Sequence, residues 1–432
     1  RGFVKDGNKN RLRAQDIHQI VDVFNRQTEV PRYARMVPLA EIASAANDYN
    51  LNLPRYIDSS EPEDLHDLDA HLNGGIPDRD IEALGAYWHV FPTLRQTLFG
   101  ASARAGYSEA LIESRQVKRA ILDHPEFQAF AARLATVFDG WREARCPLLM
   151  GLKVNDLPKA IIHTLSEDLL ARFSDLPLVS RYDVYQRLMD YWVAVMQDDV
   201  YLIAADGWKD AAQPRAVIED KVRKIKESPD LSIGRKKYKL DLLPPALVVA
   251  RYYPTEQAAI DALEAAQDEA ARVLEEYVEE HSGDEGLLTD ALTDKGRVTK
   301  GSVKDRLKAI REEPDSDEEF AALKRCLELI DAEADAGKAV KEAQSELDAK
   351  VLAGYAKLSE AEIKSLVVEN KWFAALQAGI EGEVEQLTQR LAARVRELEE
   401  RYAKPLPTLS RDIELLSAKV EGHLKVMGFA WA

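Results

Sequence analysis

The sequence predicts a mainly α-helical protein that begins with the end of an α/β domain. Three observations predict this fold class: helix and strand patterns alternate over residues 1–58, apolar residues three and four positions apart dominate the chain that follows, and the last segment repeats its apolar stripe every eleven residues. Such spacings place apolar side chains on one helix face. We predict four domains: the α/β end at 1–58, a helical domain at 59–212, a basic, proline-bounded insertion or linker region at 213–253, and a long-helix or coiled-coil tail at 254–432.

Composition limits the class of protein. The chain has 432 residues, of which 46% are hydrophobic and 31% charged, so it can build two or three hydrophobic cores. A formal net charge of -17 argues against a nucleic-acid clamp over the whole surface, although it allows a local basic patch. Cys146 and Cys326 are too few for a disulfide framework, which fits a reducing cytosol.

We expect no membrane span or leader in this chain. A membrane-spanning helix needs about twenty apolar residues in a row, and the sequence contains no such run. We therefore expect a cytoplasmic protein without membrane contact. The sequence starts at Arg1-Gly2-Phe3, without an initiator methionine or a leader, so we expect a fragment of a longer protein.

The first 35 residues predict a loop, a helix and the start of a strand. Residues 1–13 mix glycine, asparagine and basic residues, which is typical of a surface loop. Apolar residues at helical spacing predict a helix over 16–24 that ends before Pro31. Residues 35–37 predict a strand.

A second helix and an extended arm follow. Pro38 suits the first turn of a helix, which we expect to end before residue 47. Because Pro54 lacks an N–H and disfavours helix before it, we predict a short strand or extended arm over 47–57. The polar side chains at its start fix a turn through hydrogen bonds to the backbone, rather than forming an active site; they are Asn47, Asp48 and Asn50.

Apolar residues three and four positions apart also predict the helices of the helical domain at 59–212. Prolines stand near most of the expected helix boundaries, where they begin or end a helix. The helices are expected over 65–72, 77–98 with a break at Pro92, 117–122, 127–141, 157–173 and 184–196.

The tail predicts long helices over 255–281 and from about 317 to 351, and a last pair over 373–402 and 409–427. A repeat of eleven residues is about 3.67 residues per turn, so the stripe of the last pair runs nearly straight. Pro405 and Pro407 enforce a turn, and we predict that the last two helices pair as an antiparallel hairpin. Each helix buries one stripe, so a further surface, within this chain or on a partner, is needed to cover the rest. Burial in the core and contact with a partner therefore both stay open for these stripes. The predicted interface residues are Phe373, Leu376, Ile380, Val384, Leu387, Leu391, Val395, Leu398, Leu409, Ile413, Leu416, Val420, Leu424 and Met427.

Familiar catalytic motifs are missing from the sequence. It contains no G-x-G-x-x-G, no phosphate-binding loop, no H-E-x-x-H and no G-x-S-x-G. We predict no catalytic, cofactor-binding or metal-binding residue in this chain. One group of residues could suggest a metal site, but we interpret it as the solvated polar face of a helix. The group comprises Asp64, His66, Asp67, Asp69 and His71.

Two basic segments are candidates for contact with nucleic-acid phosphates. Clustered cations displace counterions from phosphates, but acidic residues interleave with the second segment, so a solvated face stays open as the other interpretation. The first segment has Lys5, Lys9, Arg11 and Arg13, and the second has Lys221, Arg223, Lys224, Lys226, Arg235, Lys236, Lys237 and Lys239.

Several segments resemble one known family. The first 58 residues closely resemble the end of the catalytic domain in the modification subunit of type I restriction-modification systems, which are adenine-N6 DNA methyltransferases. The segments are Gly2-Phe3-Val4-Lys5-Asp6-Gly7-Asn8-Lys9-Asn10, Asp16-Ile17, Val37-Pro38-Leu39-Ala40-Glu41-Ile42, Asn47-Asp48-Tyr49-Asn50-Leu51 and Arg55-Tyr56-Ile57, with weaker likeness in Asp241-Leu242-Leu243-Pro244-Pro245, Leu406-Pro407 and Met427-Gly428-Phe429.

The resemblance implies a Rossmann-like methylase domain that uses S-adenosylmethionine, of which residues 1–58 are the truncated end. It also implies a helical part that packs on a specificity subunit, assembly with a restriction subunit, and DNA held by the assembled complex. The family's catalytic Asn-Pro-Pro-Tyr/Phe motif occurs nowhere in this sequence. We therefore expect this fragment to bind no cofactor productively and to be inactive, because the groups that hold a flipped adenine are missing.

Two other interpretations stay open. The chain could be a stand-alone DNA-binding scaffold that uses the second basic segment, or a coiled-coil protein without any methylase link. The α/β pattern of residues 1–58 argues against the second of these, since a pure coiled coil has no use for it.

Overall fold

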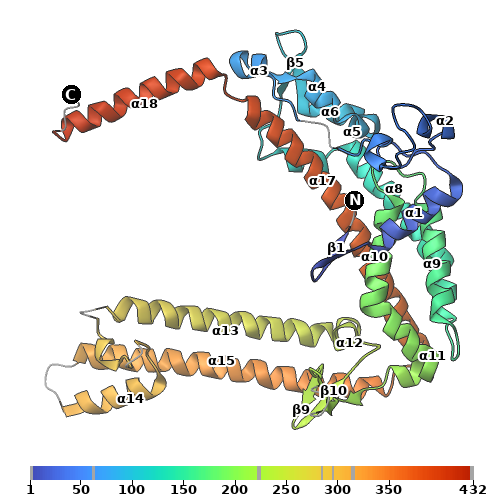
Figure 1. The fold of residues 1–432 in the computed structure, drawn as a ribbon. Coiled ribbons are helices and arrows are strands. Elements are labelled where there is room, and N and C mark those ends of the chain that lie inside the picture. The colour runs from blue at the N-terminus through green and yellow to red at the C-terminus, as the bar shows by residue number, and fades with distance from the viewer. Residues whose placement is uncertain are drawn as a thin grey trace. The chain divides into compact units, whose positions relative to one another are not determined.

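The structure is a computed structural model that describes residues 3–60, 64–220, 225–283, 286–293, 296–312 and 317–428. It is mainly helical with a few small sheets, as the sequence predicts (Figure 1). The chain folds into two compact units. Unit 1 comprises Arg1–Gly151, Leu157–Asp198 and Trp372–Ala432, and unit 2 comprises Leu152–Asp156 and Asp199–Lys371. The four-domain division of the sequence stays a prediction.

Unit 1 begins with a hairpin where a surface loop was predicted. Strands β1 (Val4–Asp6) and β2 (Lys9–Arg11) pair antiparallel across a turn in which Gly7 has φ 61°. This left-handed conformation costs glycine little, which makes so tight a turn possible. The predicted helix is confirmed as α1 (Ala14–Arg26), and Pro38 precedes the short helix α2 (Leu39–Ile42).

The two predicted strands of this region are wrong. Residues 35–37 form no strand; the nearest pairing among the described residues is an isolated bridge between Val30 and Ala34, which closes a tight turn. Residues 47–57 form turns and the 3₁₀ helix η1 (Leu53–Arg55). Left-handed φ angles of 44° and 55° at Asp48 and Tyr49 break any extended arm there.

The predicted role of the asparagines in this turn is confirmed. The Asn47 side chain donates a hydrogen bond to the Glu41 carbonyl at 2.9 Å, and the Asn50 side chain accepts one from the Asn52 N–H at 2.9 Å. These residues therefore hold the local backbone.

The rest of unit 1 is helical around one small sheet. Prolines at the first turns of α6, α8 and α9 begin helices, as predicted, while Pro147 lies inside the end of α8. The sheet has the antiparallel order β3-β5-β4. The elements are α3 (Leu68–Asn73), β3 (Ile76–Pro77), α4 (Asp78–Glu82), α5 (Gly85–Val90), α6 (Pro92–Leu98), β4 (Phe99–Ala101), β5 (Tyr107–Ala110), α7 (Val117–Leu122), α8 (Pro125–Met150), α9 (Pro158–Arg172), α10 (Arg181–Tyr191), the π-helix η2 (Trp192–Met196), α17 (Ala374–Tyr402) and α18 (Leu406–Val426).

Helix α17 is the central helix of unit 1. Its apolar stripe packs against α7, α10, α3 and β3. The Trp141 ring on α8 meets the Phe373 ring edge to face at 5.8 Å between centroids, and the Trp141 indole N–H donates to the Leu165 carbonyl at 3.2 Å. The stripe thus finds its partner surface within the same unit.

The predicted hairpin of α17 with α18 is therefore wrong. In Figure 1, α18 leads away from α17 and does not fold back along it, and no residue of α18 is buried. The physical reason is that α7 and α10 already cover the stripe of α17 on which α18 would pack. Helix α18 packs instead against α3.

Unit 2 combines small sheets with long helices, and its strands β6 to β10 lie within residues 213–253, where the sequence predicts an insertion or linker region. The larger sheet has the antiparallel order β6-β10-β9. The elements are α11 (Gln197–Ala211), β6 (Arg215–Ala216), β7 (Glu219–Asp220), β8 (Ile225–Lys226), β9 (Leu231–Ile233), β10 (Lys236–Lys239), α12 (Pro245–Tyr252), α13 (Pro254–His281), η3 (Thr289–Ala291), α14 (Lys300–Ala309), η4 (Ile310–Glu312), α15 (Asp317–Tyr355), α16 (Glu360–Lys364) and the π-helix η5 (Ser365–Phe373); α11 and η5 start or end at the boundary with unit 1.

A long antiparallel pair of helices does exist in the tail, but α13 and α15 form it. The Tyr277 hydroxyl near the end of α13 donates to the Ala322 carbonyl at 3.2 Å, and Glu256 at its start pairs with Lys350 at 3.3 Å. Figure 1 shows the two helices side by side. At one end, α14 closes a small core around the buried Cys326.

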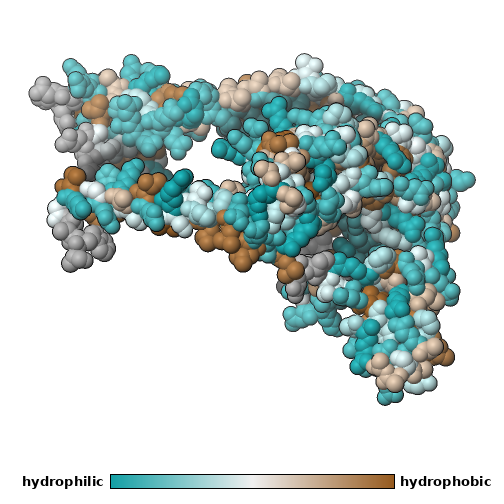
Figure 2. Space-filling model, turned by 90° about the horizontal axis from the view of Figure 1, so that it is seen from above, coloured by the Kyte–Doolittle hydropathy of each residue, from teal (hydrophilic) through white to brown (hydrophobic). Residues whose placement is uncertain are grey.

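No helix in the described part of the chain is both long and apolar enough to cross a membrane. The face seen in Figure 2 is mostly hydrophilic, with hydrophobic residues gathered at separate places.

Candidate functional site

Helix α1, near the start of unit 1, packs against α10 of the same unit through polar contacts. The Gln15 side chain donates to Asp183 at 2.7 Å, and the Gln15 N–H donates to the Gln186 side chain at 2.9 Å. The Tyr182 hydroxyl donates to Asp22 at 3.0 Å. These contacts hold α1 against α10 with directional hydrogen bonds, so its orientation is well specified.

The opposite face of α1 is apolar and exposed. Ile17, Ile20 and Val21 are about half exposed, and Phe24 is 81% exposed. An amphipathic helix normally buries its apolar stripe and leaves its polar side in water. Here the polar side is packed within unit 1, so the apolar stripe remains as a surface for another element.

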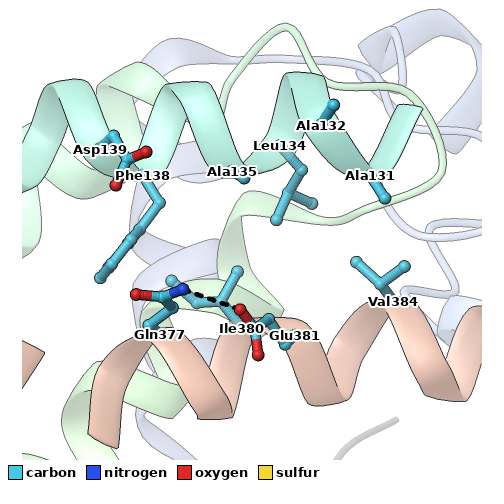
Figure 3. Close-up of a pocket in the computed structure, with 10 residues that line it drawn as sticks. All are labelled: Ala131, Ala132, Leu134, Ala135, Phe138, Asp139, Gln377, Ile380, Glu381 and Val384. Atoms are coloured by element: carbon cyan, nitrogen blue, oxygen red, sulfur yellow. Dashed lines mark hydrogen bonds between the residues drawn. The ribbon is translucent and has the colours of Figure 1, made fainter. Parts of the chain in front are cut away.

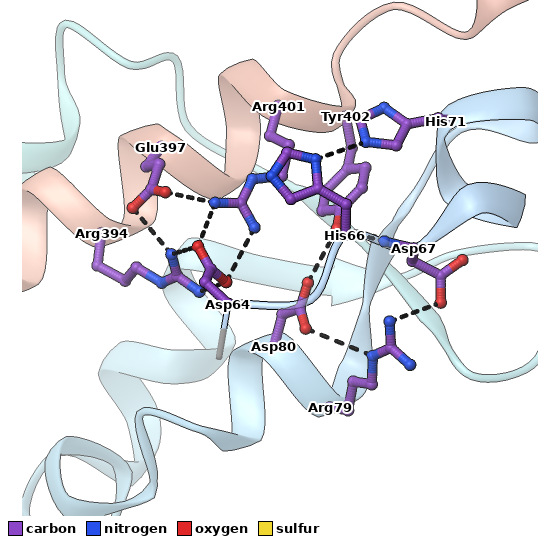
Figure 4. A network of polar contacts seen from close by, with 10 residues as sticks. All are labelled: Asp64, His66, Asp67, His71, Arg79, Asp80, Arg394, Glu397, Arg401 and Tyr402. Carbon is purple, nitrogen blue, oxygen red and sulfur yellow. Dashed lines mark hydrogen bonds and ion pairs between the residues drawn. The ribbon is translucent and has the colours of Figure 1, made fainter. Parts of the chain in front are cut away.

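Asp64, which lies shortly before α3, is joined to α17 by a network of charged side chains (Figure 4). Asp64 accepts hydrogen bonds from Arg394 at 2.8 and 2.9 Å, and from Arg401 at 3.0 Å. Glu397, one turn from each arginine, pairs with both. The two guanidinium groups hold the pKa of the Asp64 carboxyl well below its usual range.

We expect Asp64→Asn to remove a pH-dependent part of the stability of unit 1. A lowered carboxyl pKa gives stability that is present above the unfolded pKa of about 3.9 and is lost as pH falls below it. Because the side chain is 42% exposed, the loss at pH 7 should be about 1 kcal/mol or less. Urea unfolding between pH 7 and pH 3 measures it. The variant should be less stable than wild type by the same amount from pH 7 to about pH 5, and the difference should narrow as the pH falls below about 4 toward the lowered pKa of Asp64. A difference that does not narrow would contradict the assignment.

The histidines and aspartates next to this network, which the sequence alone could suggest as a metal cluster, make hydrogen bonds within the protein. Asp67 caps α3 by accepting the Ala70 N–H at 2.9 Å, and His66 shares a hydrogen bond of 3.1 Å with His71. The Tyr402 hydroxyl donates to the buried Asp80 at 3.1 Å. Within the described ranges, no three His, Cys, Asp or Glu side chains are grouped to hold a metal ion.

The first basic segment is only partly brought together. Lys9 and Arg11 project from the same face of the β1–β2 hairpin, where Arg11 lies 4.0 Å from Asp6, while Lys5 projects from the other face. Arg13 is engaged in the N-terminal turn of α1, where its guanidinium binds Asp16 at 2.9 and 3.0 Å and lowers the pKa of that carboxyl. The hairpin cations are therefore the part of this segment that is presented to solvent.

The second basic segment is divided in the same way. Lys221, Arg223 and Lys224 lie outside the described residues, as does the side chain of Lys226. Arg235, in the turn between β9 and β10, and Lys236 and Lys237, at the start of β10, are exposed, whereas Lys239 pairs with Asp230 at 2.8 Å. This turn is the densest exposed group of cations that the two segments offer in the described chain.

Near the base of the same sheet, Arg215 links two carboxylates. It binds Glu227 at 2.8 and 2.9 Å and also pairs with Asp241. The guanidinium lowers the pKa of Glu227 to about 2. Acidic residues that interleave with the basic segment therefore serve the internal structure of the sheet.

The predicted partner interface separates into a buried half and an exposed half. On α17 and just before it, all of these side chains are buried except the half-buried Val384, so they belong to the core of unit 1 and offer no docking surface; they are Phe373, Leu376, Ile380, Val384, Leu387, Leu391, Val395 and Leu398. On α18 all are exposed except the half-buried Leu424; they are Leu409, Ile413, Leu416, Val420, Leu424 and Met427.

A hollow of about 350 Å³ lies between α8 and α17 (Figure 3). Small side chains of α8, including Ala131 and Ala135, leave this space beside Ile380 and Val384. At the edge of this hollow, Glu381 accepts a hydrogen bond from Gln377 at 2.9 Å. Its lining is mainly apolar and presents no nucleophile beside a base, so it has the chemistry of a packing defect rather than of a catalytic site.

The charge network around Asp64 could not be found from the sequence, since the two arginines that bind Asp64 follow it by 330 and 337 residues.

Comparisons with known proteins give a match at the N-terminal end of the chain. No curated protein and no solved structure matches the chain. The family model of the N-6 DNA methylases matches residues 1–65, which include the β1–β2 hairpin, α1, α2 and Asp64, and this match supports a relation to the adenine-N6 methyltransferases.

Proposed function

We propose that this chain is the C-terminal part of the modification subunit of a type I restriction-modification system, an adenine-N6 DNA methyltransferase that uses S-adenosylmethionine. In this proposal the chain helps to assemble the subunit with the specificity subunit and the restriction subunit and to enclose DNA. The observation that carries it is the match of residues 1–65 to the N-6 DNA methylase family model.

Two surfaces support the proposal. The exposed apolar stripe of α1, with Phe24 at its end, fits a helix that lies against the body of a methylase domain. The exposed stripe of α18 fits a helix that packs on another subunit, because contiguous exposed apolar residues mark interaction sites. Both surfaces are outside the core of unit 1.

Binding to the specificity subunit is the direct test. The full chain, mixed with the specificity subunit of the same system, should elute with it in size-exclusion chromatography. The complex should persist at high salt, since it is held by apolar burial rather than by exposed charges. Failure of the two proteins to associate would contradict the proposal.

The chain alone should not methylate DNA, because its sequence has no Asn-Pro-Pro motif to hold the target adenine. The measurement is transfer of a labelled methyl group from S-adenosylmethionine to duplex DNA that contains many sequence contexts. Transfer above the level of a heat-denatured control would contradict this expectation.

Direct DNA binding by unit 2 is the second candidate, favoured by the exposed cations at the β9–β10 turn. Replacing Arg235, Lys236 and Lys237 with glutamine should weaken DNA binding. Each lost phosphate contact reduces the slope of log K against log salt by roughly 0.9, so three contacts reduce it by about 2.7. A matched control neutralises three exposed cations elsewhere in unit 2, namely Lys304, Lys308 and Arg311. Equal effects of the two triple variants would contradict a specific contact.

A further inference from the structure

The helical segment η5 is wound differently from its neighbours. The chain is helical without a break from α16 through η5 into α17, and the nine residues Ser365–Phe373 of this stretch form a π-helix. Each N–H of a π-helix binds the carbonyl five residues before it instead of four, so a π turn holds one residue more than an α turn. Such turns are rare in proteins and often lie at functional sites. Contacts that select the π winding over the α winding therefore point to a role for η5.

Arg251 on α12 contacts η5 at two residues that are neighbours in the π winding. Its guanidinium donates to the Ser365 hydroxyl at 3.1 Å and to the Asn370 side-chain carbonyl at 2.7 Å. These two residues are five positions apart in the sequence, and on an α-helix they would point about 140° away from each other. One planar guanidinium could not reach both of them there. The contact of Arg251 therefore selects the π winding between Ser365 and Asn370.

Lys371 fixes the direction of the following turn. Its ammonium binds Asp199 at 2.7 Å and donates to the Leu242 carbonyl at 2.7 Å, and the Lys371 and Asp199 side chains are 10% and 4% exposed. A change of one residue in helix register turns a side chain by about 100°. It would carry Lys371 away from Asp199 and leave the carboxylate in a poorly hydrated site, which is strongly unfavourable. The C-terminal end of η5 is therefore held in one register by a buried contact.

The N-terminal end of η5 is held by a contact at the surface. Arg251 is exposed to solvent, and so are its hydrogen bonds to Ser365 and Asn370. Contacts at the surface open more easily than buried ones. When Arg251 lets go, the extra residue can move toward α16, so that Ser365 turns away from Asn370 while Lys371 stays on Asp199. Two registers are thus available to η5.

We propose that η5 is a helix-register switch and that Arg251 is its latch. In the latched register the extra residue lies between Ser365 and Asn370, and in the second register it lies nearer to α16. Conversion between the two breaks and remakes the backbone hydrogen bonds of a few residues, which takes microseconds to milliseconds in proteins. All of the contacts that carry the inference lie within unit 2, so it does not rest on the proposed restriction-modification function.

Deletion of one residue tests whether η5 carries an extra one. Glu369 is exposed between Ser365 and Asn370, and its removal leaves these two residues four positions apart, as neighbours on an α-helix are. The full chain should then fold, with a urea midpoint close to that of wild type. Deletion of Asp335 is the matched control, because this exposed acid lies in the uninterrupted α-helix α15. There the loss of a residue turns the rest of α15 against α13 and should lower the midpoint strongly. Equal losses from the two deletions would overturn the inference.

Hydrogen exchange of the full chain tests the latch. Arg251→Met should speed the exchange of the amides over residues 360–370 by roughly tenfold, because a charge-assisted contact no longer favours one register. The same substitution should change the exchange little after deletion of Glu369, since the shortened helix has a single register. A contact that merely stabilises the surface would speed the exchange equally in both backgrounds. That result, or an unchanged rate in the undeleted chain, would overturn the switch, with the exchange of α13 as the internal reference.

Discussion

Replacing Leu387 with aspartate should unfold unit 1. Leu387 is 1% exposed on the central helix α17, where it lies in the stripe that packs against the rest of the unit. A carboxylate at this position would lose its hydration without gaining a partner, which costs several kcal/mol even after relaxation. Since whole domains are stable by about 5–15 kcal/mol, one such change removes a large fraction of the stability of unit 1.

Denaturant unfolding followed by tryptophan fluorescence and circular dichroism measures the effect. Leu387→Ala should give a graded loss of about 2–5 kcal/mol, as expected for a cavity in a packed core. Leu416→Asp is the contrast, because both leucines lie in the same kind of helical pattern while Leu416 is 61% exposed. It should change the free energy of unfolding of the monomer by less than about 0.5 kcal/mol. Similar losses for Leu387→Asp and Leu416→Asp would contradict the separation of α17 and α18.

The difference between the buried α17 and the exposed α18 shows what apolar periodicity in a sequence can predict and what it cannot. Most helices were predicted correctly, because apolar spacing and prolines act locally; α7 and α9 follow the predicted ranges closely. The identity of the surface that covers a stripe is not local. The stripe of α17 is covered by α7 and α10, which precede it by some 200 residues or more, while α18, its neighbour in sequence, stays apart.

The errors in the first 58 residues have a different origin. Short extended patterns were interpreted as strands, but a strand needs a neighbour to accept its hydrogen bonds, and residues 35–37 have none among the described residues. The left-handed backbone at Asp48 and Tyr49 has only a weak signal in sequence, since neither residue is glycine. Conversely, the hairpin was missed although Gly7 marks its turn, because its two strands are short and polar.

The candidate site was predictable only as lists of charges. Which cations remain free depends on the acids that the fold places beside them. Arg13 is used by Asp16 and Lys239 by Asp230, whereas the β9–β10 turn keeps Arg235 and Lys236 exposed. The interleaved acids were visible in the sequence, but which cation each one would pair with was not.

The second large effect is expected at the buried ion pair of unit 2. Lys371 in the π-helix η5 binds Asp199 at 2.7 Å and donates to the Leu242 carbonyl at 2.7 Å. The two side chains are only 10% and 4% exposed. Lys371→Met removes the ammonium group that faces Asp199 and leaves its carboxylate in a poorly hydrated site. Breaking a buried pair on one side in this way costs about 3–5 kcal/mol.

The double variant Lys371→Met/Asp199→Leu separates the value of the pair from the cost of breaking it. If the penalty comes from the buried charge left behind, removing both charges should recover most of the loss, so the double variant should be more stable than either Lys371→Met or Asp199→Leu. Urea unfolding of the full chain, with Lys350→Met as an exposed lysine control, gives the four free energies of the cycle and the baseline. Additive losses in the double variant would show instead that each side chain contributes through separate contacts, such as the hydrogen bond from Lys371 to the Leu242 carbonyl.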